Sequence, residues 1–370
     1  MGAHTLRRVK ANDFVISLRS FQGGIEWSGI EGAITFHYVV LTPIKHVYEP
    51  FFAHLFKSIA YIQALRSTTN LIRDGQDLRF SHFVQVDLPI IPLPEQRTIA
   101  SFLDTETSKI DALVSEQRRL IELLKEKRQA VISHAVTKGL DPDVPMKDSG
   151  IEWLGEVPEG WEVGPLKRFW SVTDCKHVTA EFVDEGGIPL ASIREVQSKW
   201  VELSEAKRTT QEFYDLLIGG GRQPQVGDLI FSRNATVGEV AQVKIDTPQF
   251  AMGQDVCLMR RIHRDSSPDY WQHLIKSTEV VEQMSVLMVG ATFKRINVDE
   301  IRNLSVVSPP LDEQTVIAEF LDIKVERFDS LIAQAERAIE LLQERRTALI
   351  SAAVTGKIDV RQFATEETVA

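Results

Sequence analysis

The sequence has little cysteine, no long apolar run and no excess of positive charge. Its two cysteines, Cys175 and Cys257, stand far apart and outside any CxxC pair. This pattern argues against a zinc site and favours buried free thiols. No apolar run is long enough to cross a bilayer, and the first residues lack the apolar core of a signal peptide. We therefore expect a cytoplasmic protein that has no membrane partner.

Motifs for catalysis are missing as well. The chain has no HExxH, no GxGxxG and no phosphate-binding loop. Residues 308–311, SPPL, keep only the prolines of an amino-methyltransferase signature. We therefore predict no catalytic residues, no metal site and no cofactor in this chain. The net charge of -10 also counts against non-specific affinity for nucleic acid, which depends on Lys and Arg.

The strongest feature that is present is an internal repeat. Residues 94–104, PEQRTIASFLD, align with residues 312–322, DEQTVIAEFLD. Residues 121–137 align with residues 339–355 at the same offset of 218 residues. Upstream, NDFVIS at residues 12–17 resembles GDLIFS at residues 227–232. With 370 residues and 43% hydrophobic content, the chain is expected to hold two related globular parts.

Each copy of the repeat predicts one long helix. Apolar residues recur at spacings of three and four, with glycine near each end (Gly139, Gly356). The first stripe is Ile99, Leu103, Ile110, Leu113, Leu120, Leu124, Val131 and Ala135, and the second is Ile317, Leu321, Phe328, Leu331, Ile339, Leu342 and Leu349. One interpretation is an amphipathic helix packed on its own domain. The alternative, which the matched lengths favour, is an antiparallel pair about a pseudo-twofold axis.

Short strand-like runs lie between the two helices. They cover residues 228–231, 237–243 and 256–259, and a helical stretch follows at residues 268–284. The region is therefore expected to be an α+β module. Only about 90 residues precede the first long helix, so the first module is expected to lack the part equivalent to residues 161–226.

At this point the chain resembles the specificity (S) subunits of type I restriction-modification systems. The resemblance rests on PLPEQRTIASFLD and PPLDEQTVIAEFLD, on LLKEKRQAVISHAVTKGL and LLQERRTALISAAVTGKI, and on MKDSGIEWLGEVPEGWEV, VGDLIFSRNATVGEVA, NDFVISLRSFQGGIEWS and GATFKRINVDEI. These motifs occur in order along nearly the whole chain, and several occur twice.

The resemblance implies an α+β fold with two target-recognition domains joined by two long helices in an antiparallel coiled coil. Each domain would read one half of a bipartite double-stranded DNA site, as part of a system that defends the cell against foreign DNA. The helices would dock two modification (methyltransferase) subunits, and restriction (translocase and nuclease) subunits would complete the endonuclease complex. S-adenosylmethionine, ATP and Mg²⁺ would belong to these partner subunits, and this chain would perform no chemistry.

We therefore divide the chain into six parts. They are a partial first target-recognition domain (1–93), the first long helix (94–140), a linker (141–160), the second target-recognition domain (161–309), the second long helix (310–358) and a flexible tail (359–370). The short first domain leaves an alternative open. A truncated, S-like structural adaptor would dock partner subunits without reading DNA specifically.

Base readout needs polar side chains on loops that enter a groove of the DNA. In the second domain we predict DNA contacts from two loops, with Ser232, Arg233, Asn234 and Thr236 in one and Thr292, Lys294, Arg295 and Asn297 in the other. In the first domain the candidates are Arg19, Ser20, Gln22, Gln76 and Arg79. The alternative for each loop is a solvated turn.

Overall fold

The structure is a computed structural model that describes residues 6–17, 25–68, 80–179, 181–288, 295–361 and 363. The chain divides into two compact units, which we describe separately. Unit 1 holds Met1–Ile121 and Ile332–Ala370, and unit 2 holds Glu122–Leu331. Within the described residues, no helix is both long enough and apolar enough to cross a membrane.

The two predicted long helices are present. Helix α4 covers Leu93–Lys138 and helix α9 covers Leu311–Val354. Gly139 and Gly356 follow their last turns with φ of 80° and 71°, a backbone conformation that favours glycine and ends a helix. The apolar stripe differs from the predicted one near the middle of α4. Val114 and Ile121 are buried there, whereas Leu113 and Leu120 are exposed.

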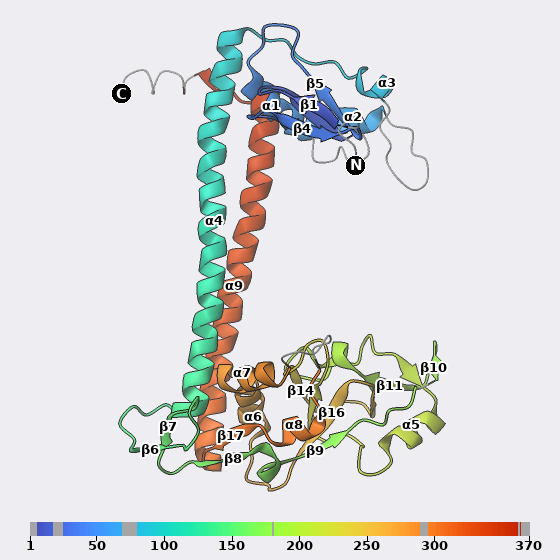
Figure 1. Cartoon of the computed structure of the whole chain (residues 1–370), viewed down its shortest axis with the longest axis vertical. Helices are drawn as coiled ribbons and strands as arrows, with labels where there is room; N and C mark the ends of the chain where they lie inside the picture. The colour runs from blue at the N-terminus through green and yellow to red at the C-terminus, as the bar shows by residue number, and fades with distance from the viewer. Residues whose placement is uncertain are drawn as a thin grey trace. The chain divides into compact units, whose positions relative to one another are not determined.

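In each unit the start of one long helix packs beside the end of the other (Figure 1). Unit 1 buries Ile99 and Leu103 of α4 with Ile350 and Val354 of α9. Unit 2 buries the equivalent residues, 218 positions away, which are Ile317 and Leu321 of α9 and Ile132 and Val136 of α4. The helices therefore form the antiparallel coiled coil that the matched lengths favoured.

Ion pairs between the helices follow the same symmetry. In unit 2, Arg128 of α4 binds Asp329 of α9. In unit 1, Arg346 of α9 binds Asp111 of α4, with Nε 2.9 Å from Oδ1 and Nη2 3.3 Å from Oδ2. Both residues of the second pair are related to the first by the offset of 218, so the repeat extends to polar contacts between the helices.

The other described residues of unit 1 form short strands and three helices. Strand β2 (Phe14–Ser17) lies between β3 (Glu26–Trp27) and β5 (Tyr38–Leu41), and β1 (Leu6–Val9) pairs with β4 (Gly32–Thr35). The helices are α1 (Glu49–Lys57), α2 (Ile59–Ser67) and α3 (Phe80–Phe83). Phe14, Phe51, Phe52 and Phe56 form the aromatic centre of this core.

The described part of unit 2 contains two four-stranded sheets. The central sheet is antiparallel, in the order β14 (Val240–Gln242), β13 (Leu229–Ser232), β16 (Val256–Arg261), β9 (Trp170–Asp174). The outer sheet has the order β10 (Phe182–Val183), β12 (Arg208–Thr209), β11 (Ile188–Ala191), β15 (Ala251–Met252). Two hydrogen-bonded pairs complete the strands, β8 (Glu162–Pro165) with β17 (Ser305–Ser308) and β6 (Met146–Asp148) with β7 (Glu156–Pro158).

Six short helices of unit 2 are described outside the long helices. They are η3 (Leu166–Arg168), η4 (Ile193–Val196), α5 (Gln211–Ile218), α6 (Pro268–Ile275), α7 (Thr278–Leu287) and α8 (Val298–Arg302). The helical stretch expected at residues 268–284 is therefore two helices, because the chain turns at Ser277, whose backbone is extended.

The helix pair α1–α2 of unit 1 is equivalent to α6–α7 of unit 2. EPFFAHLFKS (49–58) aligns with PDYWQHLIKS (268–277) at an offset of 219 residues, a similarity that the sequence analysis missed. Two contacts to the long helices repeat as well. In the first, Gln96 accepts a hydrogen bond from Tyr48 N, and the equivalent Gln314 accepts one from Ser267 N. In the second, Ser351 accepts a hydrogen bond from Ile59 N, and the equivalent Ser133 accepts one from Thr278 N. Each unit is thus held by the start of one long helix and the end of the other.

Candidate nucleic-acid interface

The first predicted loop of unit 2 leaves the end of β13 as a tight polar turn. Ser232 Oγ donates to the carbonyl of Asn234 over 3.1 Å, and Asn234 Oδ1 accepts from Ala235 N over 2.9 Å. Ala235 has a φ of 57°, which makes the turn compact. Thr236 is exposed, and its Oγ1 accepts a hydrogen bond from Gln197 Nε2 over 2.9 Å. The loop therefore presents Asn234 and Thr236 at the surface.

The second predicted loop lies beside the first. Asn234 and Arg295 form an antiparallel bridge, and Ile296 N donates to the carbonyl of Arg233 over 3.0 Å. Arg295 is exposed, so the structure brings Asn234, Thr236 and Arg295 together. Asn297 is the N-cap of α8, and its N–H donates to Glu300 Oε2 over 2.7 Å. Asn297 therefore has a local structural role beside any contact with DNA.

Ser232 and Arg233 are buried. Arg233 is 2% exposed, and its Nη2 lies 2.7 Å from Asp174 Oδ1 in an ion pair without the angle of a hydrogen bond. The Arg233 N–H donates to the carbonyl of Asp255 over 2.8 Å. The guanidinium therefore lies beneath the loop and faces the end of β9. The DNA contacts of this loop stay a prediction, but burial changes the role that we expect for Arg233.

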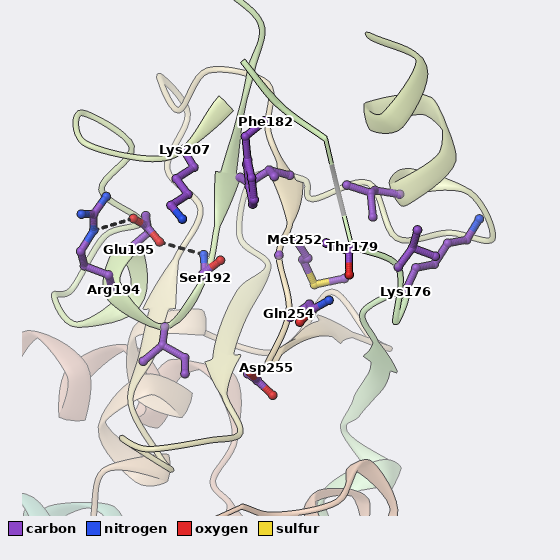
Figure 2. A pocket seen from close by; sticks show the side chains of 15 residues that line it. Lys176, Thr179, Phe182, Ser192, Arg194, Glu195, Lys207, Met252, Gln254 and Asp255 are labelled. Atoms are coloured by element: carbon purple, nitrogen blue, oxygen red, sulfur yellow. Dashed lines mark hydrogen bonds and ion pairs between the residues drawn. The ribbon is translucent and has the colours of Figure 1, made fainter. Parts of the chain in front are cut away.

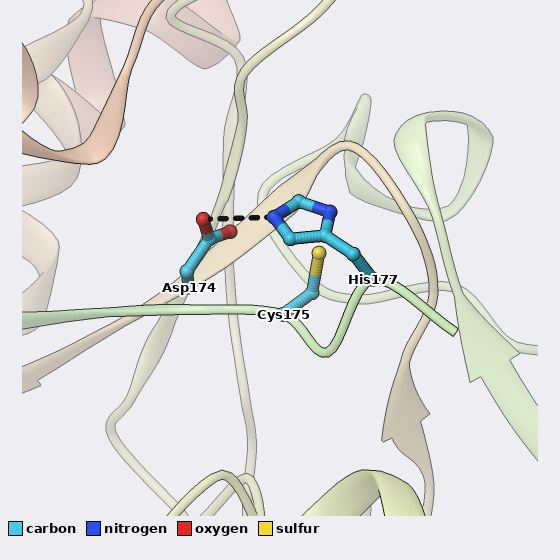
Figure 3. Close-up of side chains that lie close together, drawn as sticks. All are labelled: Asp174, Cys175 and His177. Atoms are coloured by element: carbon cyan, nitrogen blue, oxygen red, sulfur yellow. Dashed lines mark hydrogen bonds and ion pairs between the residues drawn. The ribbon is translucent and has the colours of Figure 1, made fainter.

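Asp174, Cys175 and His177 gather where β9 ends (Figure 3). Their potential ligand atoms lie within 4.8 Å of one another, and His177 Nε2 lies 3.2 Å from Asp174 Oδ2. Burial raises the pKa of the Cys175 thiol, and the Asp174 carboxylate raises it further. The thiol is therefore neutral at physiological pH, and the Arg233 cation already faces Asp174. This chemistry suits a polar support for the loop better than a metal ion.

The remaining candidates lie outside the described residues. They are Arg19, Ser20, Gln22, Gln76 and Arg79 of the first domain and Thr292 and Lys294 of the second. Strand β2 ends at Ser17, the position that aligns with Ser232 at the end of β13. Arg19, Ser20 and Gln22 therefore follow, in the sequence, a strand that is equivalent to β13.

A pocket of about 490 Å³ lies beside the loop and was not predicted (Figure 2). Its lining includes Lys176, Phe182, Lys207, Gln254 and Asp255. Lys207 Nζ lies 4.7 Å from the centre of the exposed Phe182 ring, close enough for a cation–π contact. Within the described part of the chain, neither Lys176 nor Lys207 forms an ion pair. The pocket therefore adds two lysines and an exposed aromatic ring to this surface.

The sequence could not have identified this pocket. Its lining comes from separate segments that only the outer sheet brings together, and each lysine alone looks like ordinary surface. Arg194 also lines the pocket, but unlike the two lysines it has a carboxylate partner. Its Nε binds Glu195 over 3.0 Å, and Glu195 in turn accepts from Ser192 N over 2.9 Å, so Arg194 is already partnered (Figure 2).

Comparison with known proteins adds independent evidence. A sequence model described as "Type I restriction modification DNA specificity domain" matches residues 158–341. The chain is 23% identical over 337 residues to the type I restriction enzyme EcoKI specificity subunit of Escherichia coli K12, covering 86% of this chain and 68% of that protein. It is 24% identical over 292 residues to the MjaVIII specificity subunit of Methanocaldococcus jannaschii, covering 76% of this chain and 64% of that protein.

Solved structures show the same fold. One chain, from work on the assembly and conformational transition of the type I R-M system, matches with a TM-score of 0.72 at 14% identity, covering 94% of this chain and 83% of that chain. The HsdS subunit of Thermoanaerobacter tengcongensis matches with a TM-score of 0.54 at 14% identity, covering 97% and 84%. From the sequence relatives, the matching domain and this fold, we conclude that the chain belongs to the family of type I restriction-modification specificity subunits.

Proposed function

We propose that this chain is the DNA-reading subunit of a type I restriction-modification complex. The observation that carries the proposal is the meeting of Asn234, Thr236 and Arg295 on one surface, beside Lys176 and Lys207, which form no ion pair with a described residue. Asn suits the edge of adenine, Arg that of guanine, and Lys the phosphates. Local positive charge on this surface offsets the acidic balance of the whole chain.

The subunit performs no chemistry itself, and its partners supply adenine methylation and DNA cleavage. The coiled coil is the surface on which two modification subunits dock. Leu113, Leu120 and Leu123 of α4 and Leu341 of α9 are exposed to solvent, although leucine is usually buried. Such side chains gain free energy when a partner helix covers them. No comparison favours the alternative of an adaptor that does not read DNA.

Co-expression with the modification subunit, followed by mapping of methylated adenines across the host genome, tests the proposal. A methylated motif of two fixed parts separated by a constant gap is the expected result. Methylation of one half-site pattern alone would mean that only one unit reads DNA. A stable complex that methylates nothing would support the adaptor instead.

Single substitutions then test which residues of this surface contribute to DNA binding. Asn234→Ala and Arg295→Ala should each weaken specific binding by about 1–3 kcal/mol and relax the motif at one position. Lys176→Ala should weaken binding to all sequences alike and reduce its salt dependence. Glu212→Ala, an exposed change on α5, is the matched control and should leave both unchanged.

A further inference from the structure

A second surface of unit 2 is apolar with an acidic rim, whereas the candidate DNA surface carries lysine and arginine. A groove of about 570 Å³ runs between α7, α8 and the segment around Trp153. Val286 is 72% exposed, Leu287 44% and Trp153 41%, and the buried Leu304 completes the apolar lining. The residues that the structure describes leave this face uncovered. Contiguous exposed apolar side chains with a polar rim are typical of surfaces that bind another protein.

The rim of the groove is acidic. Glu279, Glu282, Asp299 and Glu300 line it, and no lining residue is basic. Asp299 is paired with Arg302 over 2.8 Å. Among the described residues, Glu282 forms no ion pair, and Glu279 Oε2 is buried without a hydrogen-bond donor. Two carboxylates at the groove therefore lack the positive partner that would stabilise them.

We infer that this groove docks a cationic amphipathic segment of another protein. Apolar side chains of the segment would cover Val286, Leu287 and Trp153, while its Lys or Arg side chains would pair with Glu279 and Glu282. DNA and anionic lipid are poor occupants, because the carboxylates would repel their phosphates. The inference goes beyond DNA reading, since it depends on the charge and shape of this groove alone.

The equivalent helix of unit 1 lacks these features. At the offset of 219, the positions of Glu279, Glu282 and Val286 are occupied by Ala60, Gln63 and Ser67 of α2. The acidic apolar groove is thus not part of the shared repeat. This absence agrees with a binding site that belongs to unit 2 rather than with a requirement of the fold.

The test uses the full chain and a fluorescently labelled synthetic helix of leucine and lysine, measured by fluorescence polarisation. We expect a dissociation constant on the order of micromolar that rises with salt. A peptide of the same composition scrambled to remove its apolar face should bind at least tenfold more weakly. The double variant Glu279→Lys/Glu282→Lys should lose at least tenfold in affinity. Val286→Asp should also bind more weakly, because it places a charge in the apolar part.

The matched control is Glu181→Lys/Glu212→Lys, which reverses two exposed carboxylates elsewhere in unit 2 and should bind the peptide as the natural chain does. Urea unfolding of each variant separates loss of binding from loss of the fold. Equal binding by the groove and control variants would overturn the inference, as would no binding by the natural chain. Self-association that Val286→Asp abolishes would also overturn it, since the occupant would then be a second copy. Methylation mapping with the groove variant tests DNA reading separately.

Discussion

At the scale of single residues, the candidate interface has a buried polar layer beneath an exposed one. Arg233 and Asp174 face each other under the loop, while Asn234 is half-buried and Thr236 is exposed. A buried guanidinium is costly unless it is paired, so the pair fixes where the loop leaves β13. Because Arg233 is buried, we expect it to affect DNA binding through the loop that it supports and not as a direct reader.

Arg233→Ala should accordingly lower stability as well as DNA binding. Removing the guanidinium leaves the Asp174 carboxylate without its buried cation and with only the exposed His177 beside it. Because the Asp174 side chain is 32% exposed, we expect a loss of about 2 kcal/mol in the free energy of unfolding, less than for a fully buried pair. Urea unfolding measures the loss. Arg295→Ala, at an exposed arginine of the neighbouring loop, should change stability by less than about 0.5 kcal/mol. Equal stability of the two variants would contradict the supporting role.

The sequence predicted a polar loop at this position but not which of its side chains are buried. The structure has a turn after β13, which ends at Ser232, and brings this turn beside Arg295, while the DNA contacts of both loops stay a prediction. The burial of Arg233 depends on Asp174, which is distant in sequence and reaches the loop only through the pairing of β9 with β16. The pocket was missed for the same reason, since its residues meet only in the folded sheet.

At the scale of elements, the repeat fixes each unit to the long helices through equivalent buried glutamines. Gln96 and Gln314 are both 1% exposed. Gln96 accepts from Tyr48 N and donates to the carbonyl of Ile91, and Gln314 makes the same contacts with Ser267 N and the carbonyl of Pro309. In each unit one glutamine side chain thus joins the residue before a short helix, α1 or α6, to the segment that precedes a long helix, α4 or α9. Periodicity located the long helices, but this contact needed the folded structure.

Gln96→Ala and Gln314→Ala should destabilise their units by similar amounts. Each change leaves a backbone N–H and a carbonyl without their partner, at a cost of about 1–3 kcal/mol. Because each glutamine bonds only within its own unit, the two losses should add to within about 0.5 kcal/mol in the double variant. Chemical unfolding of the two single variants and the double variant measures this. Strong non-additivity would show that the two contacts are not independent.

A second contact at this scale depends on pH. Asp322 of α9 accepts from His273 over 3.0 Å and from Lys199 over 2.6 Å, and these partners lower its pKa to about 2. Since the folded pKa lies below the unfolded value, the pairing stabilises the fold above about pH 4 and is lost as the pH falls toward 2. The side chain is 38% exposed, so we expect only about 1 kcal/mol.

Asp322→Asn should therefore reduce stability at neutral pH and flatten its decline between about pH 4 and pH 2. Unfolding by urea at a series of pH values measures both effects. Asp312→Asn, at an exposed position on the same helix, is the control and should keep the natural slope. An unchanged slope in Asp322→Asn would mean that the ion pairs at this helix contribute nothing to acid sensitivity.

At the scale of the whole molecule, matched helices suit the proposed reading of two separated half-sites. Half-sites one turn of DNA apart on the same face are about 34 Å apart, and a stiff helix pair fixes a distance better than a flexible linker. Ion pairs at equivalent positions, Arg128 with Asp329 and Arg346 with Asp111, help to hold the register of the two helices. We propose that the length of this pair sets the gap in the recognised sequence.

Lengthening both helices together tests this proposal. A heptad inserted at equivalent positions of α4 and α9 keeps the apolar seam in phase and adds about 10 Å, or about three base pairs of DNA. Methylation mapping of the complex should then show the same two half-sites with a longer gap. A heptad in α4 alone is the control, because it disrupts the register with α9 and should lower stability without giving a new motif. An unchanged gap in the doubly lengthened protein would mean that contacts outside the helices set the spacing.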